Sequence, residues 1–305
     1  MSIKLGTIKH IAAVIAILAT TAFFVGFLIK NPSTLDTLLA IDPLTLLILL
    51  IGYSLIIAAN GIALFYSLRY FHLKTNLKEN ILLTGYSSII NFFGPLQSGP
   101  GVRAIYLKKK HGLSFKKFLG ITIVFYVFFI TANASVLAGL AFARAASPLI
   151  AAAVIFAAAA LGAAMFWLLY NANQRVKTIA ASLGKIRFAS REVGYIGIAA
   201  LLLFAATLII FGAEIFYVSD SYTIVNALGY TATANLSLFV SLTPGSLGFR
   251  EAFLVFAGSL HQVSLADIVT ANIIDRAFNV VFLILLFGFL LAIGSVGRFT
   301  AYRRD

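Results

Sequence analysis

Five long apolar stretches contain no charged side chain, and they limit what this chain can fold into. They cover residues 11–29, 43–68, 118–143, 148–170 and 195–213. A helix needs about 20 apolar residues to cross roughly 30 Å of hydrocarbon, so each stretch is long enough for a membrane span. Only 11% of the 305 residues are charged, whereas soluble domains carry about 25%. The sequence therefore predicts an all-α polytopic membrane protein.

The formal net charge is +13, and its distribution decides which partners to expect. The basic residues lie in short loops beside the predicted spans, above all in residues 69–78 and 108–117. Such loops stay on the cytoplasmic side, and their side chains can touch anionic lipid headgroups. We find no nucleic-acid-binding motif beside them. The expected partners are membrane lipids and not nucleic acid, and the sequence leaves a homo-oligomer open.

A break interrupts the apolar sequence at residues 241–260, SLTPGSLGFREAFLVFAGSL. Pro244 cannot donate a backbone hydrogen bond, and Gly245 and Gly248 permit conformations that are closed to other residues. Non-helical backbone is tolerated at membrane depth only where protein or a water-filled cavity surrounds it. We interpret residues 222–260 as a re-entrant hairpin that enters from outside, with a short helix that starts near Ser246.

A second break, GPLQSGPG at residues 94–101, lies between the two basic loops. If the apolar segment before this break crossed the membrane completely, the loops would lie on opposite sides, against the positive-inside rule. A re-entrant hairpin over about residues 80–108, which enters and leaves on the cytoplasmic side, removes this conflict. Two short full crossings in place of each hairpin are the alternative, and they leave the termini on the same faces.

The two halves of the chain repeat the order span, span, hairpin, span. The pseudo-repeats cover about residues 1–145 and 146–305 of a single transmembrane domain, residues 1–305. The sequence His-Gly-Leu-Ser-Phe at His111 returns as His-Gln-Val-Ser-Leu at His261. Because the first half starts inside and the second outside, we predict inverted-topology repeats in a multi-pass protein of the cell membrane, with cytoplasmic N- and C-termini. Such folds place a substrate site near the midplane.

Charged residues at the breaks and in the last span mark a candidate site. Arg103 and Arg250 each fall in the first turn of a short helix, where unpaired N–H groups favour an anion. Arginine also offers a planar donor that matches phosphate oxygens. Glu251 follows Arg250, and Asp275 and Arg276 lie inside the last span. This pattern is typical of a site for a phosphate headgroup. There are two structural alternatives: the ion pairs Glu251–Arg276 and Arg250–Asp275, or arginines that reach the membrane interface.

One face of the last span carries further polar groups. Asn272, Arg276 and Asn279 follow helical spacing on this face, with Asp275 beside them. A charge inside the membrane costs at least about 2.5–3.5 kcal/mol on insertion scales. These side chains are therefore expected to face protein or water, and we include both asparagines among the candidate substrate contacts.

Two other polar features of the spans receive structural interpretations. Glu214 lies near the outer end of its predicted span, so its side chain is expected to reach the membrane interface. Tyr53, Asn60 and Ser67 follow a seven-residue spacing on one predicted span, and such stripes usually join helices.

Several classes of chemistry lack the residues that they need. The chain has no cysteine and four scattered histidines, and we find no metal-ligand spacing. There is also no catalytic triad and no pair of carboxylates spaced for hydrolysis. The sequence therefore predicts no catalytic residue, no metal site and no cofactor.

The break at residues 241–260 resembles the flippase-like transmembrane domain of the lysylphosphatidylglycerol synthase/flippase family. In that family a Pro-Gly-x-x-Gly-x-x-Glu motif precedes an arginine in the last span. The matching positions here are Pro244, Gly245, Gly248, Glu251 and Arg276.

The break at residues 94–101 is similar to the family's first motif at four positions, and it departs from that motif elsewhere. The similar positions are Asn91, Pro95, Gly99 and Arg103. Pro100 occupies the place of the motif's acidic residue, and Phe125 and Tyr126 stand where the family has a charged dyad.

The resemblance implies a membrane protein that translocates, or helps to translocate, a lipid with a charged, phosphate-containing headgroup. Two other functions stay open: a membrane-embedded transferase that acts on a polyprenyl-phosphate or phospholipid, and a secondary transporter of a small anion. Family members that synthesise aminoacyl lipids carry an additional soluble domain. This chain ends soon after its last predicted span, so we expect no aminoacyl transfer.

Overall fold

The computed structural model describes residues 40–93, 98–143, 190–239 and 249–294, which are helical throughout apart from short connections. Four helices are long and apolar enough to cross a membrane: α3 (Pro43–Tyr70), α6 (Phe115–Ala143), α9 (Arg191–Val218) and α13 (Leu265–Ala292). The all-α architecture with several spans is therefore as predicted. The predicted spans at residues 11–29 and 148–170 lie outside the described residues.

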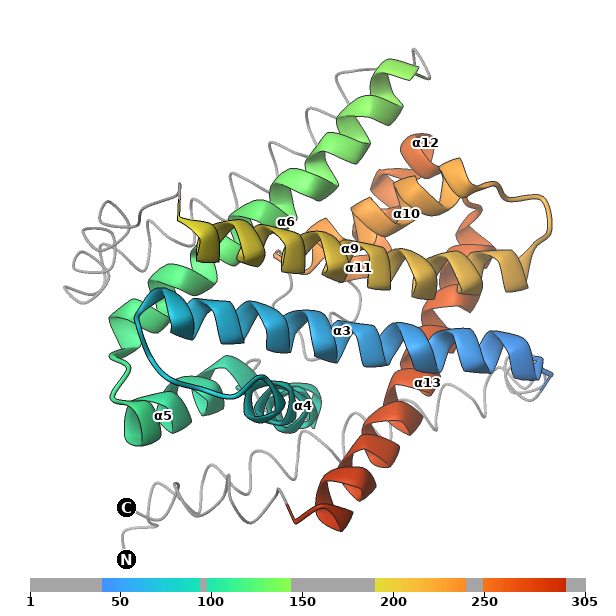
Figure 1. Cartoon of the computed structure of the whole chain (residues 1–305). Helices are drawn as coiled ribbons and strands as arrows, with labels where there is room; N and C mark the ends of the chain where they lie inside the picture. The colour runs from blue at the N-terminus through green and yellow to red at the C-terminus, as the bar shows by residue number, and fades with distance from the viewer. Residues whose placement is uncertain (1–39, 94–97, 144–189, 240–248, 295–305) are drawn as a thin grey trace, which may run out of the picture.

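Helices α3 and α9 lie side by side and antiparallel at the centre of the molecule (Figure 1). A Cβ atom added to Gly52 of α3 would come within 2.5 Å of Cγ1 of Ile210 on α9. Near the opposite end, Tyr66 stacks on Tyr195 with ring centroids 4.4 Å apart. The absence of a side chain at Gly52 permits the close approach of α3 and α9, as is usual between helices in membranes.

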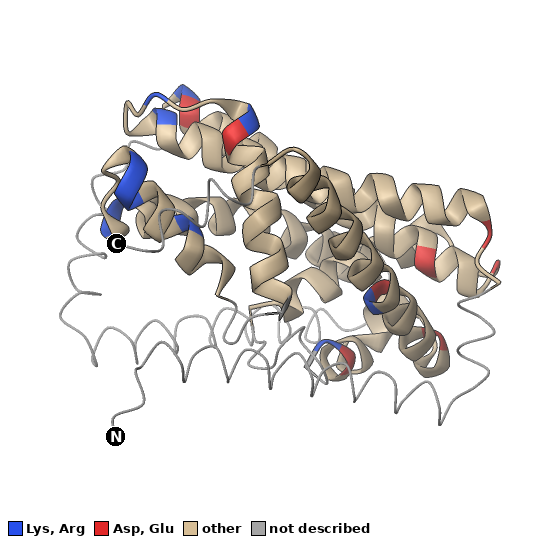
Figure 2. Cartoon of the chain, turned by 90° about the horizontal axis from the view of Figure 1, so that it is seen from below, with Lys and Arg blue, Asp and Glu red and all other residues tan. Residues whose placement is uncertain are grey.

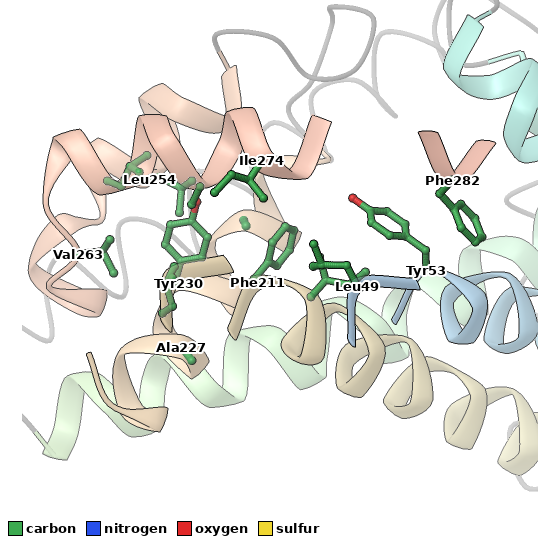
Figure 3. Close-up of a cluster of buried hydrophobic side chains, with 14 of the residues drawn as sticks. Leu49, Tyr53, Phe211, Ala227, Tyr230, Leu254, Val263, Ile274 and Phe282 are labelled. Atoms are coloured by element: carbon green, nitrogen blue, oxygen red, sulfur yellow. The ribbon is translucent and has the colours of Figure 1, made fainter. Parts of the chain in front are cut away.

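The other two long helices pack around this central pair. Helix α13 crosses α9 and α3, and α6 packs against α9. A buried polar group joins α6, α9 and the neighbouring α10: the Nδ2 of Asn235 donates to Oδ1 of Asn133 at 3.0 Å and to Oγ1 of Thr207 at 2.8 Å. The main apolar core lies between α3, α9, α10 and α13 (Figure 3).

Helices α4 (Leu77–Phe93) and α5 (Gly99–His111) form a helical hairpin. A Cβ atom on Gly99 would lie 2.5 Å from the carbonyl oxygen of Ser87, so only glycine fits at this crossing. At the other end, Oε1 of Glu79 accepts a hydrogen bond from Tyr106 at 2.9 Å and lies 2.8 Å from Nε2 of His111. The start of α4 and the end of α5 therefore contact each other. Residues 94–97, which include Pro95, lie outside the described residues.

Three short helices form a second hairpin, whose two ends also contact each other. It contains α10 (Ile224–Ser237), α11 (Phe249–Phe256) and α12 (Gly258–His261). The Nδ2 of Asn226, near the start of α10, donates to the carbonyl oxygen of His261 at 2.9 Å. Residues 240–248, with Pro244, Gly245, Gly248 and the predicted helix start at Ser246, lie outside the described residues.

The connections from each hairpin to the next long helix have matching geometry 150 residues apart. Gly112 and Gln262 both adopt positive φ angles, 66° and 57°, directly after the last helix of the hairpin. Ser114 then accepts a hydrogen bond at Oγ from the backbone N–H three residues on, before α6, and Ser264 does the same before α13. Equivalent chain reversals thus precede both helices.

Charged residues separate along the long helices. Figure 2 shows most lysines and arginines at one end of the molecule and acidic residues near the other. Arg69 ends α3 and Arg191 begins α9 at the basic end, whereas Asp42 precedes α3 and Asp220 follows α9 at the other. This distribution is typical of a multi-pass membrane protein.

Candidate functional site

Two ion pairs join α11 to α13 inside the apolar part of the molecule. Arg250 pairs with Asp275, and Arg276 pairs with Glu251. Adjacent residues of one helix thus contact adjacent residues of the other. These are the two pairs that the sequence suggested. Removing a charge from water is costly unless it is paired, so each carboxylate allows its arginine to lie at this depth.

Asp275 has a second partner on α3. The hydroxyl group of Tyr53 donates a hydrogen bond to Oδ1 of Asp275 and also lies 3.0 Å from that residue's carbonyl oxygen. The ring of Tyr53 stacks on Phe278 and Phe282, at centroid distances of 5.9 and 5.3 Å. The seven-residue spacing in the sequence predicts only a helix-joining role for Tyr53. Its single signal for more was a hydroxyl group in the middle of an apolar span.

Arg250 also contacts an aromatic ring on α9. Its guanidinium carbon lies 5.6 Å from the ring centroid of Phe211 on α9, a distance at which the ring face attracts a cation. Its Nε atom is buried and has no hydrogen-bond partner among the described residues. The Nε atom of Arg276 is also buried and without a hydrogen-bond partner among the described residues. Both guanidinium groups therefore retain a donor that no described group uses.

The two candidate asparagines of α13 differ in their surroundings. Asn272 is buried, and its Nδ2 donates to the hydroxyl group of Tyr230 at 3.2 Å and to the carbonyl oxygen of Ile268 at 2.8 Å. Asn279 is half-buried and makes no hydrogen bond within the described residues. In Figure 3 Tyr230 lies below Ile274 of α13. Asn272 thus links α13 to α10, beside the ion pairs.

Glu214 does not reach the membrane interface, contrary to expectation. Its exposed fraction is 0%, and neither carboxylate oxygen has a hydrogen-bond partner among the described residues. The reason is the position of α9, which packs against α3, α6, α10 and α13. A side chain at residue 214 consequently meets neighbouring helices instead of lipid headgroups.

The first hairpin holds the remaining candidate residues. The Nε atom of Arg103 donates to the hydroxyl oxygen of Ser87, and Arg103 is half-buried. Oδ1 of Asn91 accepts a hydrogen bond from the backbone N–H of Gly99 at 3.3 Å, at the start of α5. Unlike Arg250 and Arg276, Arg103 has no carboxylate partner within the described parts of the chain.

The two arginine sites lie at different levels along α13. Gly85, two residues before Ser87, lies against Leu286: a Cβ atom there would be 3.5 Å from its Cδ1. Leu286 is three helical turns beyond Asp275, which corresponds to about 16 Å at 1.5 Å per residue. The structure thus brings Arg250, Glu251, Asp275 and Arg276 together and keeps the first hairpin's arginine apart from them.

Comparison with known proteins assigns the chain to a family. The family model for the lysylphosphatidylglycerol synthase TM region matches residues 11–288, a range that includes both hairpins, the helices α3, α6 and α9, and α13 up to residue 288. No curated protein and no solved structure shows a significant match. The chain therefore belongs to the family of the lysylphosphatidylglycerol synthase transmembrane region.

Proposed function

We propose that this protein translocates, or helps to translocate, a lipid whose charged headgroup contains phosphate. The observation that carries the proposal is Arg103, a half-buried guanidinium group bonded to the Ser87 hydroxyl and to no carboxylate of the described chain. A cation at membrane depth is costly without an opposite charge. A phosphate group supplies that charge and matches the donor geometry of arginine.

The second hairpin supplies a site where a headgroup would exchange with carboxylates. Arg250 and Arg276 are each neutralised in the present structure, by Asp275 and Glu251. A phosphate group that enters would take donors of these arginines, and the carboxylates would then hold the arginines less tightly or bind a cationic part of the headgroup. Family membership supports a membrane role for both hairpins.

The proposed path uses the inverted repeat. In this arrangement the two hairpins are re-entrant and open to opposite leaflets of the cell membrane, and both termini are cytoplasmic. The matching turns at Gly112 and Gln262 support a repeat, and the basic end of the molecule supports the orientation. The headgroup would pass between the two arginine sites while the acyl chains stay in the lipid.

Reconstitution into liposomes tests the proposal. Fluorescent phospholipids with anionic and zwitterionic headgroups are compared with a labelled diacylglycerol, and a membrane-impermeant reductant reports which leaflet holds the label. We expect the protein to move at least one phospholipid. Arg103→Gln should slow it about 10–100-fold, because a hydrogen bond to a charged group contributes about 1.5–3 kcal/mol.

The matched control is Lys109→Gln, which removes an exposed positive charge from the same helix. This variant should translocate at the rate of the unmodified protein. If no phospholipid moves, the proposal fails. Uptake of inorganic phosphate by the same liposomes, without lipid movement, would favour a small-anion transporter instead.

A further inference from the structure

Glu214 lies within a membrane-spanning helix, and no cation of the described residues forms an ion pair with its carboxyl group. It is completely buried, and both of its oxygens lack a hydrogen-bond partner among the described residues. An ionised carboxylate in such a place would lose its hydration without compensation, and groups in this position become neutral instead. Burial without a partner therefore favours the neutral, protonated form of this side chain.

Among the described residues, the charged groups that act on Glu214 are one cation, Arg250, and one carboxylate, Asp275. Four ionisable side chains act on it or on the same cluster from helices around α9: Tyr53 on α3, Tyr230 on α10, Arg250 on α11 and Asp275 on α13. The remaining neighbour, α6, has no charged residue after Lys117. Arg250 is already paired with Asp275, so it cannot also neutralise Glu214.

Within the described residues, the charges of the site balance only when one proton is included. Two cations face three carboxyl groups: Arg250, Arg276, Glu251, Asp275 and Glu214. Two of the carboxyl groups are used in ion pairs, which leaves the third with the proton. A site of this kind exchanges protons whenever the number of carboxylates paired with arginine changes.

We propose that Glu214, Asp275 and Arg250 form a proton-binding site, which takes up a second proton when an anionic headgroup occupies Arg250. This inference rests on the proposed function, and it adds that headgroup movement is coupled to protons. The site uses Glu214 as the proton carrier and Asp275 as the group that alternates between arginine and proton.

The proposed step conserves charge. When a phosphate monoanion takes the guanidinium group of Arg250, the carboxylate of Asp275 loses its cation. Glu214 then transfers its proton to Asp275, and a proton from water replaces the one that Glu214 gave. The site holds one more proton and one more negative charge than before, so its net charge is unchanged. When the headgroup leaves, Asp275 pairs with Arg250 again and one proton returns to water.

Tyr53 fits a positioning role in this step. Its hydroxyl group donates to Asp275 in the paired state, and the same oxygen can accept a hydrogen bond when Asp275 is protonated. The phenyl ring is held by Phe278 and Phe282 in either case. Asp275 can therefore change its protonation state without losing its contact with α3.

Infrared spectroscopy of the purified full chain tests the resting state directly. At neutral pH we expect a protonated-carboxyl band that shifts in deuterated water and is absent from Glu214→Gln. Glutamine has the shape of a neutral glutamic acid, so this variant should fold with an unchanged melting temperature. Glu192→Gln, at the start of the same helix, is the matched control and should keep the band. A band that persists in Glu214→Gln would overturn the inference.

Translocation under a pH difference tests the coupling. The rate of phospholipid movement is measured in liposomes with and without a pH difference across the membrane. The ratio of the two rates should be several-fold for the unmodified protein and for Glu192→Gln, and close to one for Glu214→Gln. Lipid movement that ignores the pH difference in the unmodified protein would overturn the proton inference alone. A complete lack of lipid movement would overturn the proposed function, and the infrared band would still decide whether Glu214 holds a proton.

Discussion

The guanidinium group of Arg250 on α11 lies against the carboxylate of Asp275 on α13, and each side chain is only 9% exposed. This contact ties a short helix of the second hairpin to the last long helix. A buried ion pair of this kind depends on both members, because removal of one leaves the other charge without compensation. The pair is therefore the point at which the hairpin is most sensitive to substitution.

Asp275→Asn should destabilise the protein strongly. The substitution leaves Arg250 buried without a carboxylate, and such losses amount to about 3–5 kcal/mol. Thermal unfolding in detergent measures the effect. The double variant Arg250→Met/Asp275→Leu removes both charges and should recover most of the stability. If the single variant melts at the temperature of the unmodified protein, the pair is not buried in the way described.

Tyr53→Phe should lower stability by less than Asp275→Asn. It removes a hydrogen bond to a charged group, which contributes about 1.5–3 kcal/mol, and keeps the ring that stacks on Phe282. The matched control is Tyr195→Phe, whose hydroxyl accepts an exposed hydrogen bond from Arg191. Exposed contacts with a cation contribute less than about 1 kcal/mol. Equal effects of the two variants in thermal unfolding would argue against the Tyr53–Asp275 contact.

Gly99→Ala and Gly101→Ala should differ although they lie in the same helical turn. A Cβ atom at residue 99 would come within 2.5 Å of the Ser87 carbonyl oxygen, whereas nothing lies within 4 Å of one at residue 101. The first substitution should force α4 and α5 apart, at a loss of about 1–3 kcal/mol. The second should be neutral or stabilising by up to about 1 kcal/mol, because alanine favours helix. Melting temperatures that fall equally would contradict this packing.

The base of the first hairpin should respond to acid through Glu79. Burial opposes its ionisation, but hydrogen bonds from His111, Lys110 and Tyr106 outweigh burial and lower the pKa of this carboxyl. Its folded pKa is thus below the unfolded value of about 4.3. The stabilisation is complete above the unfolded pKa and is lost as the pH falls through the folded pKa.

Melting temperatures of the unmodified protein and of Glu79→Gln, measured from neutral to acid pH, check this sign. The stability difference between the two should stay constant at neutral pH and shrink below about pH 4.3. A difference that grows in acid would show that Glu79 does not gain from its partners.

Much of the architecture is predictable because membrane spans depend on long-range composition. The stretch 118–143 became Phe115–Ala143 and the stretch 43–68 became Pro43–Tyr70. The two ion pairs are predictable for a related reason. An unpaired charge inside the membrane is costly, so opposite charges there form pairs, and adjacent charges on two segments allow few pairings.

The contacts that the sequence did not predict concern which face of an apolar helix packs against which neighbouring helix. Helix α9 is apolar around its whole circumference, so no pattern in the sequence shows that residue 214 faces the interior. The contact of Tyr53 with Asp275 joins residues 222 positions apart and requires the crossing of α3 and α13. The bond from Arg103 to Ser87 similarly depends on how closely Gly99 lets α4 and α5 approach.

Native mass spectrometry of the purified protein with added lipids tests the headgroup site most directly. Phospholipid should remain bound to the unmodified protein and to Lys109→Gln, with at least tenfold lower occupancy in Arg103→Gln, in line with a lost charged hydrogen bond of about 1.5–3 kcal/mol. Diacylglycerol, which lacks the phosphate, should bind all three proteins equally and weakly. Phospholipid occupancy that is the same in Arg103→Gln as in the unmodified protein would contradict a phosphate site at Arg103.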